Sequence, residues 1–147
     1  MIYKLRWWIP AFGMVMILYG CADEFPNRAS TDTGRWYTLA QLELGKPLFL
    51  DHCANCHGET AAGTPDWRNA DSNGVYPPPP LNGTAHSWHH PLIILERTIA
   101  AGGVPLGGVM PGFGDELNKD EIRATIAYFQ SFWSNDIYER WKEIDSR

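Results

Sequence analysis

Two cysteines and a histidine in the segment HCANCHGE, residues 52–59, are the side chains of this sequence best suited to chemistry. Cys53 and Cys56 are separated by two residues, and His57 follows directly. Two thiols at this spacing can add across the two vinyl groups of one porphyrin edge, and the imidazole that follows can then reach the iron from one face. The C-x-x-C-H pattern is the signature of covalent c-type haem attachment. It predicts Cys53 and Cys56 as haem-binding residues and His57 as an axial ligand.

Other uses of a C-x-x-C pair fit this sequence less well. A thioredoxin-like pair follows a strand in a βαβ unit, whereas the residues before Cys53, PLFLDH, have a helical pattern. A zinc site needs a second pair of ligands, and the third and last cysteine of the chain is the distant Cys21. A simple disulfide between Cys53 and Cys56 is the remaining alternative, because exported proteins hold disulfides. We expect one covalent haem c as the cofactor.

The second axial ligand is predicted to be Met110. The other three methionines lie within the first twenty residues, whereas Met110 stands in GGVMPGFGDEL, a loop of small residues that lets the backbone approach a ring face. A lone methionine usually fills a core, but Met110 is not on a core-facing helical stripe. A His/Met pair raises the reduction potential relative to two histidines. The alternative is that a histidine of TAHSWHHP replaces Met110 or binds a second metal; these histidines are His86, His89 and His90.

Helices are expected on both sides of these ligand segments, and no alternating strand pattern competes with them. Thr38 with Gln41 resembles a capping box that opens a helix running toward the cysteines, which Pro47 should kink or restart. A further helix is predicted over 91–101, ending at two glycines. The last main helix begins after Asn118, a good N-cap, and its apolar stripe consists of Ile122, Ile126, Phe129 and Trp133.

With these features in order, residues 36–133 resemble a class I cytochrome c. Gly45 and Phe49 precede the cysteines at the spacing of that family, where the glycine permits a close crossing of the first and last helices. Tyr128 resembles the partner aromatic of the last helix, and MPGFG before a capped helix completes the match. The resemblance implies an all-α, small cytochrome c fold with three to four main helices around one covalent haem. Pro47, the four prolines of 77–80 and the loop 59–76 depart from the family pattern.

Residues outside the attachment motif are also expected around the haem. In the family, the carbonyl of a proline that precedes a leucine accepts the N–H of the ligand imidazole, and Pro79-Pro80-Leu81 resembles that element. We expect Trp88 to pack near the haem propionates together with one imidazole of its loop. Arg97 is a candidate partner of a propionate.

The first twenty residues are typical of a signal peptide. Lys4 and Arg6 precede an uncharged run that is too short for the roughly 20 residues of a membrane span. The run ends in LYGC, which resembles the lipobox of bacterial lipoproteins and predicts lipidation of Cys21. We therefore predict a signal peptide over 1–20, a lipid-anchored flexible tether over 21–35, a cytochrome c domain over 36–135 and a short helix over 136–147. The protein is expected on the periplasmic side of a bacterial membrane.

Charge and motifs limit the function. The 147-residue chain has a formal charge of −5 and no run of lysine or arginine, which argues against nucleic acid as a partner. Without residues 1–20, ten basic side chains remain against 17 acidic ones, so redox partners should present a basic docking surface. No nucleophile–base pair is recognisable, and an electron carrier rather than an enzyme is predicted. The alternatives are a haem-based sensor or small-ligand binder with a labile sixth ligand, and a haem subunit of a membrane oxidoreductase.

Overall fold

The computed structural model describes residues 33–104 and 108–147, and the regular secondary structure in this part of the chain is helical, with no strand. The elements in chain order are α1 (Leu39–His52), α2 (Ala54–His57), the 3-10 helix η1 (Ser87–His89), α3 (Leu92–Ala101), α4 (Lys119–Gln130) and α5 (Asn135–Asp145). The all-α prediction is confirmed. The predicted signal peptide, Cys21 and most of the predicted tether lie outside the described residues.

Side chains cap two of the predicted helices at their first turn. The hydroxyl of Thr38 accepts from the amide N–H of Gln41, whose side chain accepts from the Thr38 amide at 2.9 Å. Asn118 and Glu121 form the same reciprocal capping box at the start of α4. Pro47 does not restart the first helix, because α1 continues to His52. Its missing N–H removes one bond of the helix, and its side chain lies on the exposed side.

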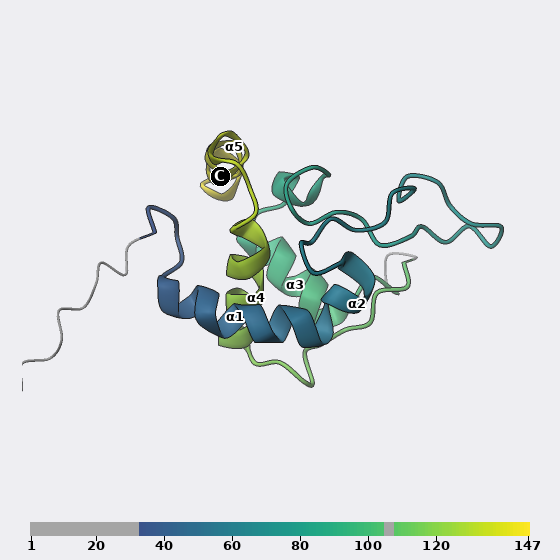
Figure 1. Ribbon diagram of the computed structural model, residues 1–147, viewed down its shortest axis with the longest axis horizontal. Helices are drawn as coiled ribbons and strands as arrows, with labels where there is room; N and C mark the ends of the chain where they lie inside the picture. The colour runs from purple at the N-terminus through teal and green to yellow at the C-terminus, as the bar shows by residue number, and fades with distance from the viewer. Residues whose placement is uncertain (1–32, 105–107) are drawn as a thin grey trace, which may run out of the picture.

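The α1–α4 crossing is the centre of the fold (Figure 1). Gly45 of α1 is buried there, and a Cβ atom at this position would overlap the carbonyl oxygen of Ala124 on α4. One turn further along, the fully buried ring of Phe49 lies 5.4 Å from the ring of Tyr128, measured between centroids. Only glycine allows the two backbones to approach this closely, so the crossing follows directly from the sequence.

Helix α5 is hydrogen-bonded to the residues at the start of α3. The indole N–H of Trp141 donates to the carbonyl of His90 at 2.9 Å, and the carboxylate of Asp145 accepts from the amide of Leu92 at 2.6 Å. Asp145 thus caps the start of α3, where Pro91 offers no side-chain oxygen of its own. This helix occupies the segment for which a short C-terminal helix was predicted.

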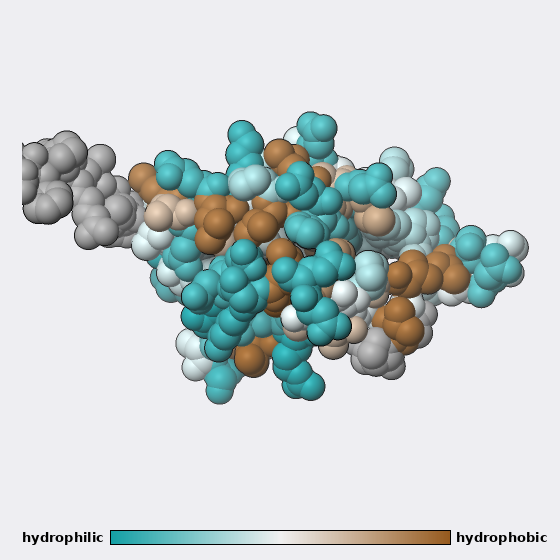
Figure 2. Space-filling model, turned by 90° about the horizontal axis from the view of Figure 1, so that it is seen from below, coloured by the Kyte–Doolittle hydropathy of each residue, from teal (hydrophilic) through white to brown (hydrophobic). Residues whose placement is uncertain are grey.

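The segment between α2 and η1 forms a long loop that extends away from the helices (Figure 1). From below, hydrophobic residues on the surface form separate groups among hydrophilic ones (Figure 2). Ile93, Val104 and Val109 are each more than half exposed. No helix within residues 33–104 and 108–147 has the length and apolar character to cross a membrane.

Candidate haem site

His57 is the most tightly held side chain of the motif. It ends the short helix α2 and is 7% exposed, and its Nδ1 lies 2.8 Å from the carbonyl oxygen of Pro79. A carbonyl can only accept a hydrogen bond, so Nδ1 carries the proton and Nε2 keeps its lone pair. The ring therefore offers one nitrogen as a metal ligand, and the partner carbonyl fixes its orientation.

The loop after α2 positions Pro79. The amide of Gly63 donates to the carbonyl of His57 at 2.6 Å, and the amide of Thr64 donates to the carbonyl of Pro78 at 3.0 Å. Gly63 has a φ of +64°, and a Cβ atom there would lie 2.5 Å from the carbonyl carbon of Pro79. A glycine is needed at this point both for the left-handed backbone and for the close approach.

Leu81 is the second fixed point of this segment. Its amide donates to the carbonyl of Ala61 at 2.8 Å, and its carbonyl accepts from the indole N–H of Trp133 at 2.7 Å. The Pro-Pro-Leu segment is therefore held in place beside His57, with the Pro79 carbonyl as the hydrogen-bond partner of the imidazole.

The two cysteines have different surroundings. Cys53 is buried, Cys56 is exposed, and neither forms a disulfide. Burial, with a smaller contribution from the neighbouring Cys56, raises the pKa of the Cys53 thiol to about 11. Cys53 is therefore a protonated thiol at neutral pH, and it is not the low-pKa nucleophile of a thiol–disulfide oxidoreductase. A thiol that adds across a vinyl group to give a thioether fits this environment.

Burial also acts on the histidine. It lowers the pKa of His57, and the hydrogen bond to Pro79 opposes that effect in part. A depressed pKa keeps the imidazole neutral at physiological pH, which is the form that binds a metal. The protonation states of Cys53 and His57 thus suit covalent attachment and ligation.

Met110 lies in a loop that is held by backbone contacts. Its carbonyl accepts from the amide of Gly103 at 2.9 Å, and its half-buried side chain packs against the hydrophobic core. Gly102, which ends α3 with a φ of +78°, leaves no room for a Cβ atom, which would lie 2.6 Å from the Met110 carbonyl oxygen. The amides of Phe113 and Gly114 donate to carbonyls at the end of α3. The segment after Met110 is therefore bonded to α3, and Met110 itself is bonded to Gly103 just beyond the end of that helix.

The other candidate residues lie in different places. Trp88 is half-buried against the core, with the ring of His89 3.8 Å away. Arg97 is exposed on α3, where it lines a cavity between α3 and the start of α4. The rings of His86 and His90 are 5.9 Å apart, and the described residues contain no group of three or more side chains placed to hold a metal ion. A second metal site at His86, His89 and His90, the alternative that the sequence left open, is therefore not assembled in this part of the chain.

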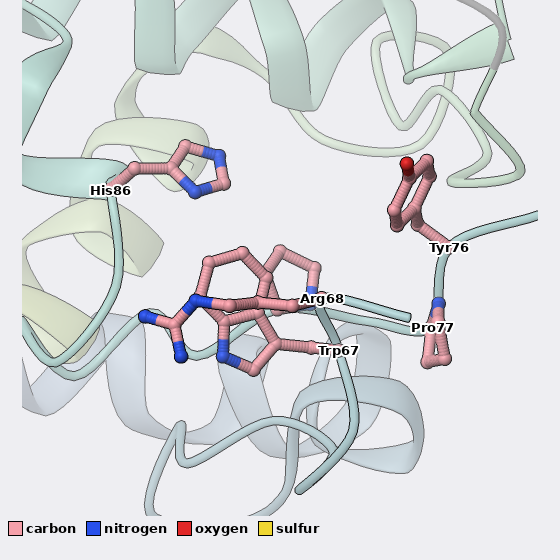
Figure 3. Close-up of a pocket in the computed structure, with 6 residues that line it drawn as sticks. Trp67, Arg68, Tyr76, Pro77 and His86 are labelled. Carbon is pink, nitrogen blue, oxygen red and sulfur yellow. The ribbon is translucent and has the colours of Figure 1, made fainter. Parts of the chain in front are cut away.

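A cavity of about 340 Å³ opens beside Pro79, and the sequence alone did not point to it. Its lining comes from Trp67, Arg68, Tyr76, Pro77, Pro79 and His86 (Figure 3). Burial, together with the nearby His90 and His89, lowers the pKa of His86. Trp67 and Arg68 belong to the loop that departs from the family pattern, so no motif spacing could have identified them.

These residues fit a covalent c-type haem. Within five consecutive positions the chain has two free thiols and a neutral imidazole whose Nε2 is not used in the hydrogen bond to Pro79. Glycines stand where the two neighbouring loops come close to other backbone: Gly63 lies against Pro79, and Gly102 lies against Met110. Thioether bonds to Cys53 and Cys56 together with ligation by His57 would use this donor set.

Comparison with known proteins agrees with this chemistry. Residues 40–129 match the family model described as cytochrome c oxidase, cbb3-type, subunit III. A curated relative, the cbb3-type cytochrome c oxidase subunit FixP of Sinorhizobium medicae (strain WSM419), is 32% identical over 94 residues. That alignment covers 61% of this chain and 29% of the relative. No solved structure matches the chain. The chain belongs to the family of cbb3-type cytochrome c oxidase subunit III and carries a covalently bound haem c.

Proposed function

We propose that the protein is a one-electron carrier whose haem iron is held by His57 and Met110. The observation that carries the proposal is the 2.8 Å contact between Nδ1 of His57 and the Pro79 carbonyl, which leaves Nε2 as the ligand. Cys53 and Cys56 would hold the porphyrin through thioether bonds. The haem supplies the redox chemistry, and the protein orients it and sets its potential.

Each residue has a defined part in that task. The Pro79 carbonyl orients the His57 ring and raises its basicity as a ligand. The loop fixed to α3 presents the thioether sulfur of Met110, a soft donor that favours ferrous iron and so raises the reduction potential. Two protein ligands, His57 and Met110, would leave no open position on the iron for a small molecule, and the haem would then supply electron transfer without bond formation to a substrate.

The family relationship favours one of the alternatives as the setting for this carrier. The relative from Sinorhizobium medicae is named as a subunit of a cbb3-type oxidase. We propose that this chain likewise delivers electrons within or to a membrane oxidoreductase, held near the membrane by a lipid on Cys21 at the periplasmic side. Replacement of Cys21 by alanine should release the protein from the membrane fraction without loss of haem.

Carbon monoxide distinguishes the carrier from a sensor. The reduced spectrum of a carrier with both axial positions filled should not change when carbon monoxide is added. A sensor or small-ligand binder with a labile sixth ligand would show a shifted spectrum within the mixing time. A shift in the unaltered protein would replace the carrier proposal with the ligand-binding one.

A further inference from the structure

We propose that Arg68, with Tyr76 and His86, forms the site that binds the propionate carboxylates of the haem. This inference rests on the proposed function, and it assigns a role to the loop 59–76 that departs from the family pattern. The arrangement of charge and hydrogen-bond donors around the cavity beside Pro79 carries it.

The cavity presents donors from two directions. His86 and Tyr76 lie on opposite sides of it, and Arg68 and Trp67 lie between them (Figure 3). The guanidinium, phenol, imidazole and indole of these side chains all carry N–H or O–H donors, and the lining contains no carboxylate. A cavity with this composition suits an anion with several oxygen acceptors, such as a carboxylate.

Arg68 is the one fixed cation of this lining. Its guanidinium carbon lies 4.4 Å from the centroid of the Trp67 ring, so the indole face orients it. The ion pairs found among the described residues join His52 to Glu116, Arg123 to Glu96 and Lys142 to Glu139, and none of them includes Arg68. The guanidinium is therefore positioned by stacking while its donors are not committed to an acid of the described chain.

The loop contains the acids Glu59, Asp66 and Asp71, none of which forms an ion pair with Arg68, and Asp71 is engaged by backbone of its own turn. The Asp71 carboxylate accepts from the amides of Asn73 and Val75 at 2.8 and 2.9 Å, and these hydrogen bonds lower its pKa. They close the loop tip directly before Tyr76, from which the chain returns toward Pro79. Together with the hydrogen bond from Thr64 to Pro78 at the base, this turn gives the loop a defined shape.

The covalent chemistry places the propionates away from the cysteines. Porphyrin vinyl groups and propionates occupy opposite edges, so thioether bonds at Cys53 and Cys56 direct the propionates toward other segments of the chain. The cavity borders Pro79, which holds His57, and its lining comes from the loop and from His86 rather than from α2. In a chain with a formal charge of −5, two further carboxylates close to the protein need local donors of this kind.

Arg97, the candidate suggested by the sequence, lies in another environment. It lines the cavity between α3 and the start of α4 together with Glu96, Asn118 and Lys119, and Pro79 is not part of that lining. The proposal therefore predicts that substitution of Arg68 alters the propionates and that substitution of Arg97 does not.

The test compares full-length holoprotein carrying Arg68→Gln with Arg97→Gln and with Arg140→Gln, an exposed position on α5 that serves as the charge-matched control. Resonance Raman spectra report the propionate bending band, which responds to hydrogen bonding at the carboxylates, and potentiometry reports the reduction potential. Arg68→Gln should shift the band and lower the potential, because a cation near the haem stabilises the reduced state. Arg68→Lys should recover the potential more fully than the band, since lysine keeps the charge but lacks the planar fork.

His86→Gln is the second variant and should shift the same band to a smaller extent. An unchanged band and potential in both Arg68→Gln and His86→Gln would overturn the proposal, as would a band shift confined to Arg97→Gln. The haem content of every variant is measured under denaturing conditions. Covalent haem with an unaltered propionate band means that this inference fails while the proposed function stands. Absence of covalent haem from the unaltered protein means that the proposed function itself fails.

Discussion

Nδ1 of His57 and the carbonyl oxygen of Pro79 lie 2.8 Å apart although 22 positions separate the two residues in the chain. The loop between them is closed by hydrogen bonds at Ala61, Gly63 and Thr64, so the orientation of the His57 imidazole depends on backbone outside the C-x-x-C-H motif. The strength of this contact should therefore be adjustable without changing any residue that touches the haem.

Gly63→Ala is expected to raise the reduction potential. The new methyl group would press against the carbonyl carbon of Pro79, at 2.5 Å, and displace the acceptor of the His57 N–H. A weaker hydrogen bond makes the imidazole a poorer donor, which favours ferrous iron. Gly74→Ala is the matched control, because its φ is +79° and no heavy atom lies within 4 Å of the added Cβ. Equal potentials in the two variants would contradict the role of the Pro79 carbonyl.

Gly45→Ala should destabilise the helix crossing. A Cβ atom at Gly45 would overlap the Ala124 carbonyl, so α1 and α4 must move apart, at a cost of about 1–3 kcal/mol for an overpacked core site. Thermal unfolding of the holoprotein measures this loss. Leu44→Ala, one position earlier and 44% exposed, should change the midpoint far less. A Gly45→Ala midpoint equal to that of Leu44→Ala would show that the crossing is looser than described.

Arg123→Met should destabilise the contact between α3 and α4. Its Nε lies 2.5 Å from a carboxylate oxygen of Glu96, whose side chain is 9% exposed. Removal of the arginine leaves that carboxylate without its ion-pair partner, and we expect a loss of about 2 kcal/mol in the free energy of unfolding, because the arginine side chain is itself partly exposed. Chemical denaturation checks it, and Arg123→Met combined with Glu96→Leu should recover part of the loss. No recovery in the double variant would argue against the pair as the cause.

The sequence predicted the parts of the fold that local chemistry decides. Thr38 and Gln41 form the predicted capping box, Asn118 is the predicted N-cap of α4, and Gly45 lies at the close crossing that the family resemblance implied. The Pro47 prediction was partly wrong, because one missing hydrogen bond on an exposed side does not restart a helix that is packed along its other face.

Contacts between distant segments were not predictable in this way. Asp145 caps α3 from 53 positions away, and no local pattern marks it as a cap. Arg68 reaches the cavity beside Pro79 through a loop without periodicity, so its position depends on the turn at Asp71 and on the base at Thr64 and Pro78. The haem-attachment motif was readable because its spacing is set by the covalent chemistry rather than by the fold.

Met110→Ala should leave the haem attached and lower the reduction potential. The proposed thioether bonds to Cys53 and Cys56 would not depend on Met110, whereas water or another weaker donor at the sixth position would stabilise ferrous iron less. We expect a decrease of more than about 59 mV, a tenfold change in the equilibrium constant of a one-electron couple. Redox potentiometry provides the value. His89→Ala, which changes a neighbour of Trp88 instead, is the comparison and should keep the potential of the unaltered protein.

Proton NMR of the reduced holoprotein tests the ligand assignment most directly. A methionine bound to diamagnetic haem iron places its methyl group in the ring current, which moves that three-proton signal far upfield of all other methyl signals. The account predicts one such signal in the unaltered protein, its loss in Met110→Leu, and its retention in His86→Ala, His89→Ala and His90→Ala. Absence of the signal from the unaltered protein, or its persistence in Met110→Leu, would contradict ligation by Met110 and with it the closed electron carrier.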